Sequence, residues 1–158
     1  MDVLKNQVYV IKRRDHNPEI VKIRGTENGF VSFITYNDTE NEVKLHISDF
    51  LFSVLAYITT IEDEKIKKGQ AVKVYTTDQI IDLIVGSSKK KTIKGFLYSR
   101  ATRNTSPIAL YNKNIPKEFC KVDMTVGIKP GLKVRVNTIS FKDELKKKKK
   151  FEEEFPRS

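Results

Sequence analysis

The sequence predicts a mostly β protein made of two small domains, and three observations lead to this prediction. Short segments rich in β-branched and aromatic residues recur along the chain, separated by clusters of Asn, Asp, Gly and Pro. The 158 residues are enough for two small barrels of roughly 60 to 80 residues each. The net charge of +10 is unevenly distributed along the chain. We expect a barrel with a terminal helix over 1–62, a basic β-rich domain with one short helix over 63–141, and a charged tail over 142–158.

Four extended segments open the chain, and turn-forming residues separate them. The segments cover residues 7–13, 19–24, 29–36 and 41–47. Between the second and third, Asn28-Gly29 favours the positive φ angles of a tight hairpin turn. Ser48 is expected to cap a helix whose apolar residues continue at helical spacing to Ile58. A meander of this size should curl into a small barrel, with the helix plugging it or joining it to the next domain.

With its short strands, tight polar turns and terminal helical turn, the stretch 7–57 resembles the small SH3-like barrels of the KOW and Tudor type. Some barrels of this type bind nucleic acid or protein tails, so the resemblance implies a binding module. Residues 1–62 contain 7 Lys or Arg and 9 Asp or Glu, a balance of −2, which offers no electrostatic reason to bind DNA. We expect this barrel to bind a protein partner or to act as a structural brace.

The basic excess lies in the second part of the chain. Residues 63–158 contain 23 Lys or Arg and 11 Asp or Glu, and within 65–135 the numbers are 16 and 4. The excess is therefore not confined to the run of lysines near the C-terminus. A folded basic surface favours a polyanionic partner, and a charge that serves only solubility is the alternative.

The stretch 87–104, SSKKKTIKGFLYSRATRN, combines this charge with aromatic residues. In a strand over 92–101, alternation places Ile93, Leu97 and Ala101 on a core face. The opposite face would carry Lys94, Phe96, Tyr98 and Arg100. We expect these aromatics to stack on bases, although a buried Phe96 with the opposite alternation remains the alternative. The residues from Lys94 to Tyr98 are similar to the start of an RNA-recognition RNP1 box, but the rest of the box departs from that pattern, so that fold is not expected.

Further strands and a helix are expected around this stretch. Residues 71–75 read as a strand, and 79–85 as a short helix with a capping residue before it and Gly86 after it, although a buried strand is the alternative. A short strand is expected over 108–111. A hairpin over 119–137, turning at Lys129-Pro130-Gly131, would bring Lys121, Lys133 and Arg135 together. If this hairpin lies beside the 92–101 strand, the three cations extend one cationic sheet face.

These patterns predict a protein that binds nucleic acid without catalysis. Double-stranded DNA is favoured over RNA, bound with little sequence preference, in the service of transcription or nucleoid organisation. The alternative is a phage structural protein or a host-protein inhibitor whose basic face meets an acidic partner. The candidate nucleic-acid-binding residues are Lys89, Lys90, Lys91, Lys94, Phe96, Tyr98, Arg100, Arg103, Lys121, Lys133 and Arg135.

The bias toward Lys and Ile, with little Ala and no Trp, is typical of an AT-rich genome. In composition and small-barrel pattern the chain resembles accessory DNA-binding proteins of T4-like phages. This resemblance implies a transcription-modulating role in the cytoplasm or nucleoid of a host cell.

Other chemistry is not indicated by the sequence. No phosphate loop, nucleophile elbow or pair of catalytic carboxylates is found, and His16 and His46 lack neighbouring ligands at zinc-binding spacing. Cys120 is the only cysteine and shares the parity of apolar neighbours, so we expect it to be buried. No apolar run approaches the roughly 20 residues that span a bilayer. We therefore expect a cytoplasmic protein with no enzyme activity, metal, cofactor or membrane partner.

Overall fold

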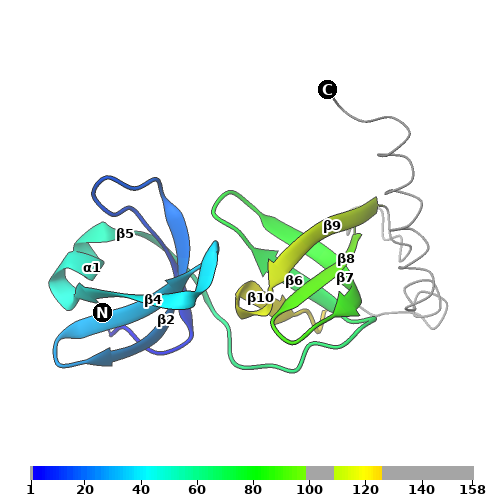
Figure 1. Ribbon diagram of the computed structural model, residues 1–158, viewed down its shortest axis with the longest axis horizontal. Coiled ribbons are helices and arrows are strands. Elements are labelled where there is room, and N and C mark those ends of the chain that lie inside the picture. The colour runs from blue at the N-terminus through cyan, green and yellow to red at the C-terminus, as the bar shows by residue number, and fades with distance from the viewer. Residues whose placement is uncertain (1, 99–108, 126–158) are drawn as a thin grey trace. The chain divides into compact units, whose positions relative to one another are not determined.

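The computed structural model describes residues 2–98 and 109–125. It confirms a mostly β fold, with two five-stranded antiparallel sheets and, within the described residues, one α-helix (Figure 1). The chain divides into two compact units. Residues up to 64 form the first unit together with 75–80 and 118–121, and the rest belongs to the second unit. The boundary near 64 lies close to the expected one at 62, but the two later segments are additions that the sequence did not indicate.

The first sheet is a four-stranded meander completed by a fifth strand. Its elements are β1 (Gln7–Ile11), β2 (Glu19–Glu27), β3 (Phe30–Thr35), β4 (Asp38–His46), α1 (Ile47–Ser53) and β5 (Val54–Thr60). The strand order is β4-β3-β2-β1-β5, so β5 returns to pair with β1. Between β2 and β3, Asn28 and Gly29 have φ angles of 52° and 80°, which confirms the predicted tight turn.

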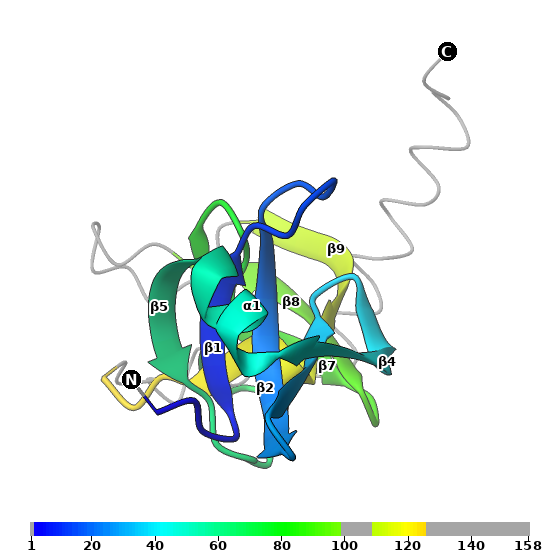
Figure 2. The ribbon, with the colours of Figure 1, turned by 90° about the vertical axis from the view of Figure 1, so that its left-hand side faces the viewer.

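Aromatic packing fixes α1 against the sheet. Phe50 is fully buried and meets Tyr9 edge-to-face, with ring centroids 5.5 Å apart. Its ring also lies 5.8 Å from that of Phe33 on β3. Figure 2 views this unit with α1 in front of β1. The helix therefore covers one face of the meander and closes its core.

The predicted helix is too long and its capping residue is wrong. His46, and not Ser48, is the cap, and its Nδ1 accepts a hydrogen bond from the backbone N–H of Ser48 at 3.2 Å. The helix ends at Ser53, and the expected continuation to Ile58 is strand β5. Pairing with β1 satisfies the backbone groups of both strands, and the β-branched residues of β5 suit an extended conformation.

A second apolar cluster holds the added segments in the first unit. Tyr75 and Phe119 are buried with four residues of the first unit: Val8, Ile20, Ile34 and Ile61. Beside this cluster, the Lys22 side chain is only 2% exposed, and its Nζ lies 2.9 Å from Oε2 of Glu118. Arg24 contacts the other carboxylate oxygen of Glu118 at 3.1 Å. Burial acts to raise the pKa of Glu118, but hydrogen bonds and attraction from the two cations outweigh it and lower this pKa below its ordinary value.

The second sheet repeats the topology of the first. Its elements are β6 (Ala71–Tyr75), β7 (Ile80–Ser88), β8 (Thr92–Leu97), β9 (Ala109–Pro116), the 3-10 helix η1 (Lys117–Phe119) and β10 (Cys120–Val122). The order β10-β6-β7-β8-β9 again places the fifth strand next to the first. In each sheet a helical segment lies between the fourth and the fifth strand. The chain thus contains the same arrangement twice.

Two expectations for this second part are wrong. Residues 80–85 belong to strand β7 and not to a helix, so the alternative of a buried strand is confirmed, because this β-branched run pairs with β8. The first strand of the hairpin expected over 119–137 already ends at Val122 within the described residues, and Met124 lies in a turn with 88% of its surface exposed. Cys120 is buried, as expected. Residues 126–137 and the tail 142–158 lie outside the described residues.

Candidate nucleic-acid interface

Three exposed lysines occupy the turn between β7 and β8, as the sequence suggested. Lys89, Lys90 and Lys91 follow the end of β7, and the N–H of Lys89 donates to the carbonyl of Thr92 at 2.9 Å. The end of β9 lies beside this turn, because the N–H of Lys117 donates to the carbonyl of Lys91 at 2.9 Å. Backbone hydrogen bonds to Thr92 at the start of β8 and to Lys117 at the end of β9 therefore fix this turn in place.

A second lysine segment is bonded to the same end of β7. The hydroxyl of Ser88 donates to the carbonyl of Ile66 at 2.9 Å, and the N–H of Gly69 donates to the carbonyl of Val85 at 2.7 Å. This places the exposed lysines that precede β6 next to the β7–β8 turn. We call the combined surface the lysine end. It consists of Lys65, Lys67, Lys68, Lys89, Lys90, Lys91 and Lys117.

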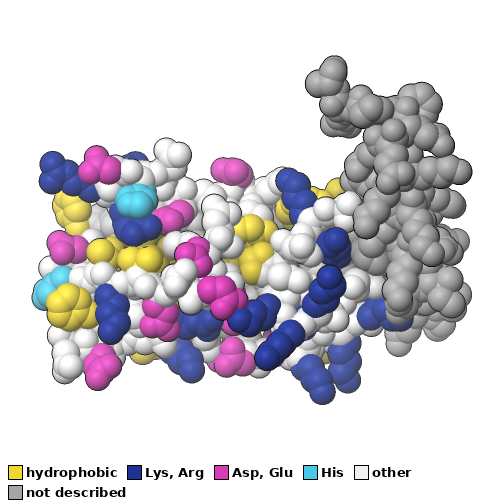
Figure 3. Space-filling model, in the orientation of Figure 1, with side chains coloured by type: hydrophobic (Ala, Val, Ile, Leu, Met, Phe, Trp, Pro, Cys, Tyr) yellow, Lys and Arg dark blue, Asp and Glu magenta, His cyan; other side chains and the backbone are white. Residues whose placement is uncertain are grey.

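The charge of the two units is opposite in sign. The described residues of the second unit include ten lysines and two aspartates, a balance of +8. Those of the first unit include eight Lys or Arg and thirteen Asp or Glu, a balance of −5. In Figure 3, Lys and Arg side chains dominate the visible face of the second unit, whereas Asp and Glu side chains gather on the first. The structure thus locates the basic excess on a folded surface.

Phe96 does not lie on this surface, and its predicted stacking role is wrong. The side chain is 7% exposed, and its neighbour Gly95 is buried as well. Register shifts interrupt both pairings of β8 next to Gly95. Since adjacent residues of a strand face opposite ways, the burial of both 95 and 96 means that neither face of β8 is open to solvent at this point. A Cβ on Gly95 would lie 2.1 Å from the carbonyl oxygen of Ile84, which shows how closely β7 approaches β8 here.

The remaining predicted residues are not all brought together. Lys94 on β8 and Tyr98 just beyond it are half-buried. Lys121 lies on β10, which is next to β6 and separated from β8 by β6 and β7, so its expected place beside the 92–101 strand is wrong. Arg100, Arg103, Lys133 and Arg135 lie outside the described residues.

Sequence reasoning missed the four lysines that precede β6 or follow β9. They are Lys65, Lys67, Lys68 and Lys117. The first three looked like part of a linker between domains. The available signal was Gly69, which follows Lys67 and Lys68 just before a strand. Glycine often supplies the positive φ of a turn, so these lysines could be expected at a turn, and Gly69 has a φ of 91°.

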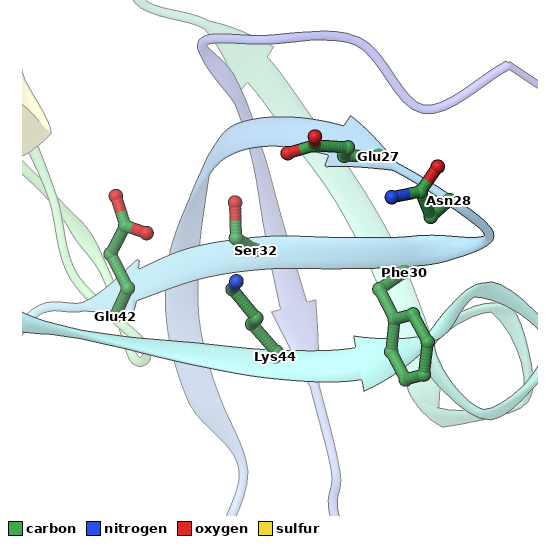
Figure 4. A pocket seen from close by; sticks show the side chains of 6 residues that line it. All are labelled: Glu27, Asn28, Phe30, Ser32, Glu42 and Lys44. Carbon is green, nitrogen blue, oxygen red and sulfur yellow. The ribbon is translucent and has the colours of Figure 1, made fainter.

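A separate pocket of about 430 Å³ lies on the first sheet (Figure 4). Its lining consists of Glu27, Asn28, Phe30, Ser32, Glu42 and Lys44. Lys44 and Ser32 are cross-strand partners, and in the figure the Lys44 side chain extends toward Ser32, whereas the Ser32 hydroxyl points away from it and donates to the carbonyl of Gly25 at 3.4 Å. Among the described residues, no group of three or more His, Cys, Asp or Glu side chains is placed to hold a metal ion. The pocket offers mixed charge without an evident catalytic arrangement.

Comparisons with family models, curated proteins and solved structures find no significant match to this chain. In the described part of the chain, no helix has the length and apolar character needed to cross a membrane.

Proposed function

We propose that the second unit binds double-stranded DNA with little sequence preference, through the lysine end. The observation that carries this proposal is a pair of hydrogen bonds, from the Ser88 hydroxyl to the carbonyl of Ile66 and from the N–H of Lys117 to the carbonyl of Lys91. These bonds gather lysines from three separate segments at one end of the sheet. Opposing carboxylates are scarce in the described part of this unit, so the surface attracts a polyanion.

The residue types favour phosphate contacts over base contacts. Lysine is a compact point charge that binds phosphate without the fixed two-pronged geometry with which arginine reads guanine. Phe96 is buried, so it is not offered to unstacked bases. The ring of Tyr111 is engaged by Lys113, whose Nζ lies 5.8 Å from its centre. Duplex DNA, which presents phosphates and keeps its bases stacked, therefore fits better than a single strand.

We further propose that the first unit is an SH3-like barrel that does not contact the DNA. A five-stranded meander whose last strand returns to the first, with a helical segment before it, supports this assignment. The balance of −5 in its described residues disfavours a DNA-binding role. The second unit then supplies the DNA contacts, in a role that suits transcription or nucleoid organisation.

The experiment measures fluorescence anisotropy of a labelled duplex of about 20 base pairs across a series of salt concentrations. If about six phosphates are neutralised, log K falls with log salt at a slope of about −5. The test variant replaces Lys89, Lys90 and Lys91 with Gln. Three lost contacts reduce the slope by about 2.7 and, at about 0.1 M salt, the affinity by up to about 500-fold.

The matched control replaces three exposed lysines of the first unit, Lys5, Lys12 and Lys44, with Gln. Both variants lose three positive charges, so a difference between them reports position and not net charge. Equal weakening in the two variants would contradict the proposal, as would the absence of duplex binding at about 50 mM salt. Parallel titrations with single-stranded DNA, RNA and an acidic protein such as ovalbumin test whether another polyanion binds better than duplex DNA. Tighter binding of any of these would also contradict the proposal.

A further inference from the structure

We propose that a groove on the first unit binds an acidic segment of another protein that carries an aromatic or aliphatic side chain. The groove has a volume of about 650 Å³ and lies between the β1–β2 loop, the end of β4 and helix α1. Its lining consists of Lys12, Arg13, Arg14, His16, Leu45, Asp49, Phe52 and Ser53. It is separate from the lysine end and does not depend on the DNA-binding proposal.

The groove carries an aromatic side chain that the fold does not use. Phe52 is 95% exposed, the most exposed of the large hydrophobic residues described. Its neighbour in the same helix, Phe50, is fully buried and completes the core, so Phe52 is not needed for packing. An aromatic ring left in water is a common anchor of protein interfaces, because its burial is strongly favourable.

The walls of the groove are held in place. The N–H of Lys12 donates to the carbonyl of Ser53 at 2.8 Å, which ties the β1–β2 loop to the end of α1. Arg13 is anchored by Glu19 at 2.6 Å and lies over the ring of Phe33, 5.8 Å from its centre. Because these contacts exist in the free protein, a partner would not have to order the loop on binding.

The charge of the groove identifies the kind of partner. Lys12 and Arg14 are exposed at the β1–β2 loop, whereas Asp49 is the one carboxylate in the lining. Arg13 is already paired with Glu19 and contributes less. On a unit where acidic residues outnumber basic ones, this is a local basic site beside an exposed aromatic. The Nζ of Lys12 donates to the carbonyl of Arg13 at 2.9 Å, but among the described residues neither Lys12 nor Arg14 is paired with a carboxylate. An acidic segment complements these two cations, and its apolar side chain covers Phe52.

The repeated topology provides an independent argument. In the second sheet, the equivalents of the β1–β2 loop and α1 are the β6–β7 turn and η1, which fall within 75–80 and 118–121 or directly beside them. There Tyr75 and Phe119 are buried in an apolar cluster, with Glu118 bonded to Lys22 and Arg24. In the second sheet, aromatic packing and carboxylate–cation pairs thus cover this end of the repeat. At the corresponding end of the first sheet, no described residue covers Phe52, which is 95% exposed.

The test is fluorescence anisotropy with the full chain and a labelled peptide that has a Glu-Glu-Phe-Glu-Glu core. Two matched peptides replace the Phe with Ala or the four Glu with Lys. We expect micromolar binding of the first peptide and at least tenfold weaker binding of both others. Phe52→Ala and Arg14→Glu should each weaken binding of the first peptide about tenfold or more, as expected for an interface anchor.

The controls use equally exposed positions outside the groove. Met124→Ala removes another exposed apolar side chain, and Lys5→Glu makes the same charge change elsewhere on the first unit. Both should bind as the unchanged protein does, and so should the chain with Lys89, Lys90 and Lys91 replaced by Gln. Loss of binding in that last variant would overturn the proposal, because the peptide would then bind the lysine end as a simple polyanion. Unchanged binding by Phe52→Ala would also overturn it, as would a dimer in sedimentation that Phe52→Ala dissociates.

Discussion

Replacement of Gly95 by Ala tests how closely the two central strands of the second sheet approach one another. An added Cβ would lie 2.1 Å from the carbonyl oxygen of Ile84 and 3.0 Å from both its carbonyl carbon and Cδ2 of Leu83. Side-chain Cβ atoms essentially never come within 3.0 Å of such an atom, so β7 and β8 must separate by nearly 1 Å at this point. The obstacle is backbone, which cannot rotate away as a side chain can.

The expected cost follows from this displacement. Overpacking of a core by one methyl group costs about 1 to 3 kcal/mol. Separation of the strands also weakens about two ladder hydrogen bonds, each worth about 0.5 to 1.5 kcal/mol. We therefore expect Gly95→Ala to lower the free energy of unfolding by about 2 to 5 kcal/mol. For a protein of this size, that corresponds to a fall in melting temperature of very roughly 5 to 15 °C.

Urea denaturation followed by far-ultraviolet circular dichroism measures this change. Gly25→Ala is the matched control, because Gly25 also lies in a strand but has no atom within 4 Å of its added Cβ and no left-handed φ. Its free energy of unfolding should stay within about 0.5 kcal/mol of the unchanged protein. If Gly95→Ala is as stable as Gly25→Ala, the proposed close approach of β7 and β8 is wrong.

Four further substitutions test the first unit, each by urea denaturation. Glu118→Gln should lower the free energy of unfolding at pH 7 by about 1 to 3 kcal/mol, because Lys22 remains buried with a weaker partner. Folding lowers the pKa of Glu118, so its ionised carboxylate stabilises the folded state. This contribution to the free energy of unfolding is complete above the ordinary pKa of about 4.3 and is lost as the pH falls through the pKa of the folded state. The difference between the two proteins should therefore vanish in strong acid, and a difference that persists there would contradict the ion pair. Gly29→Ala forces a side chain into the left-handed region at a φ of 80° and should lower the free energy of unfolding by about 1 to 2 kcal/mol. An unchanged free energy of unfolding would mean that the turn adopts another conformation. Phe50→Ala should cost about 3 to 5 kcal/mol, while Phe52→Ala should change the stability by less than about 0.5 kcal/mol; similar costs for the two would contradict their opposite burial.

Local chemistry made several features predictable from the sequence. Asn28-Gly29 required a turn whatever the rest of the chain did, because few other residues adopt positive φ so readily. Cys120 was expected to be buried from the parity of its neighbours, and it is. The lysine turn at 89–91 was expected to be exposed, since three adjacent ammonium groups are too costly to bury.

Where local preferences were nearly balanced, long-range pairing decided the outcome. Residues 54–58 have helical spacing, yet they form a strand because the edge of β1 offers backbone partners. The run 79–85 was ambiguous for the same reason, and pairing with β8 made it a strand. No local rule distinguishes these states, because the hydrogen bonds that decide them join residues distant in the sequence.

The sequence by itself determined the mostly β class, the turns and the concentration of positive charge in the second part of the chain, because these depend on residue type and on neighbours along the chain. Only the tertiary structure decided which lysines share a surface and which aromatics are free to bind. Hydrogen bonds from the Ser88 hydroxyl and the Lys117 N–H brought distant lysines to one end of a sheet. Phe96 is buried although alternation placed it on the outer face, and the packing of Phe50 left Phe52 exposed. Alternation along a strand predicts which side chains share a face, but not whether the rest of the fold covers that face.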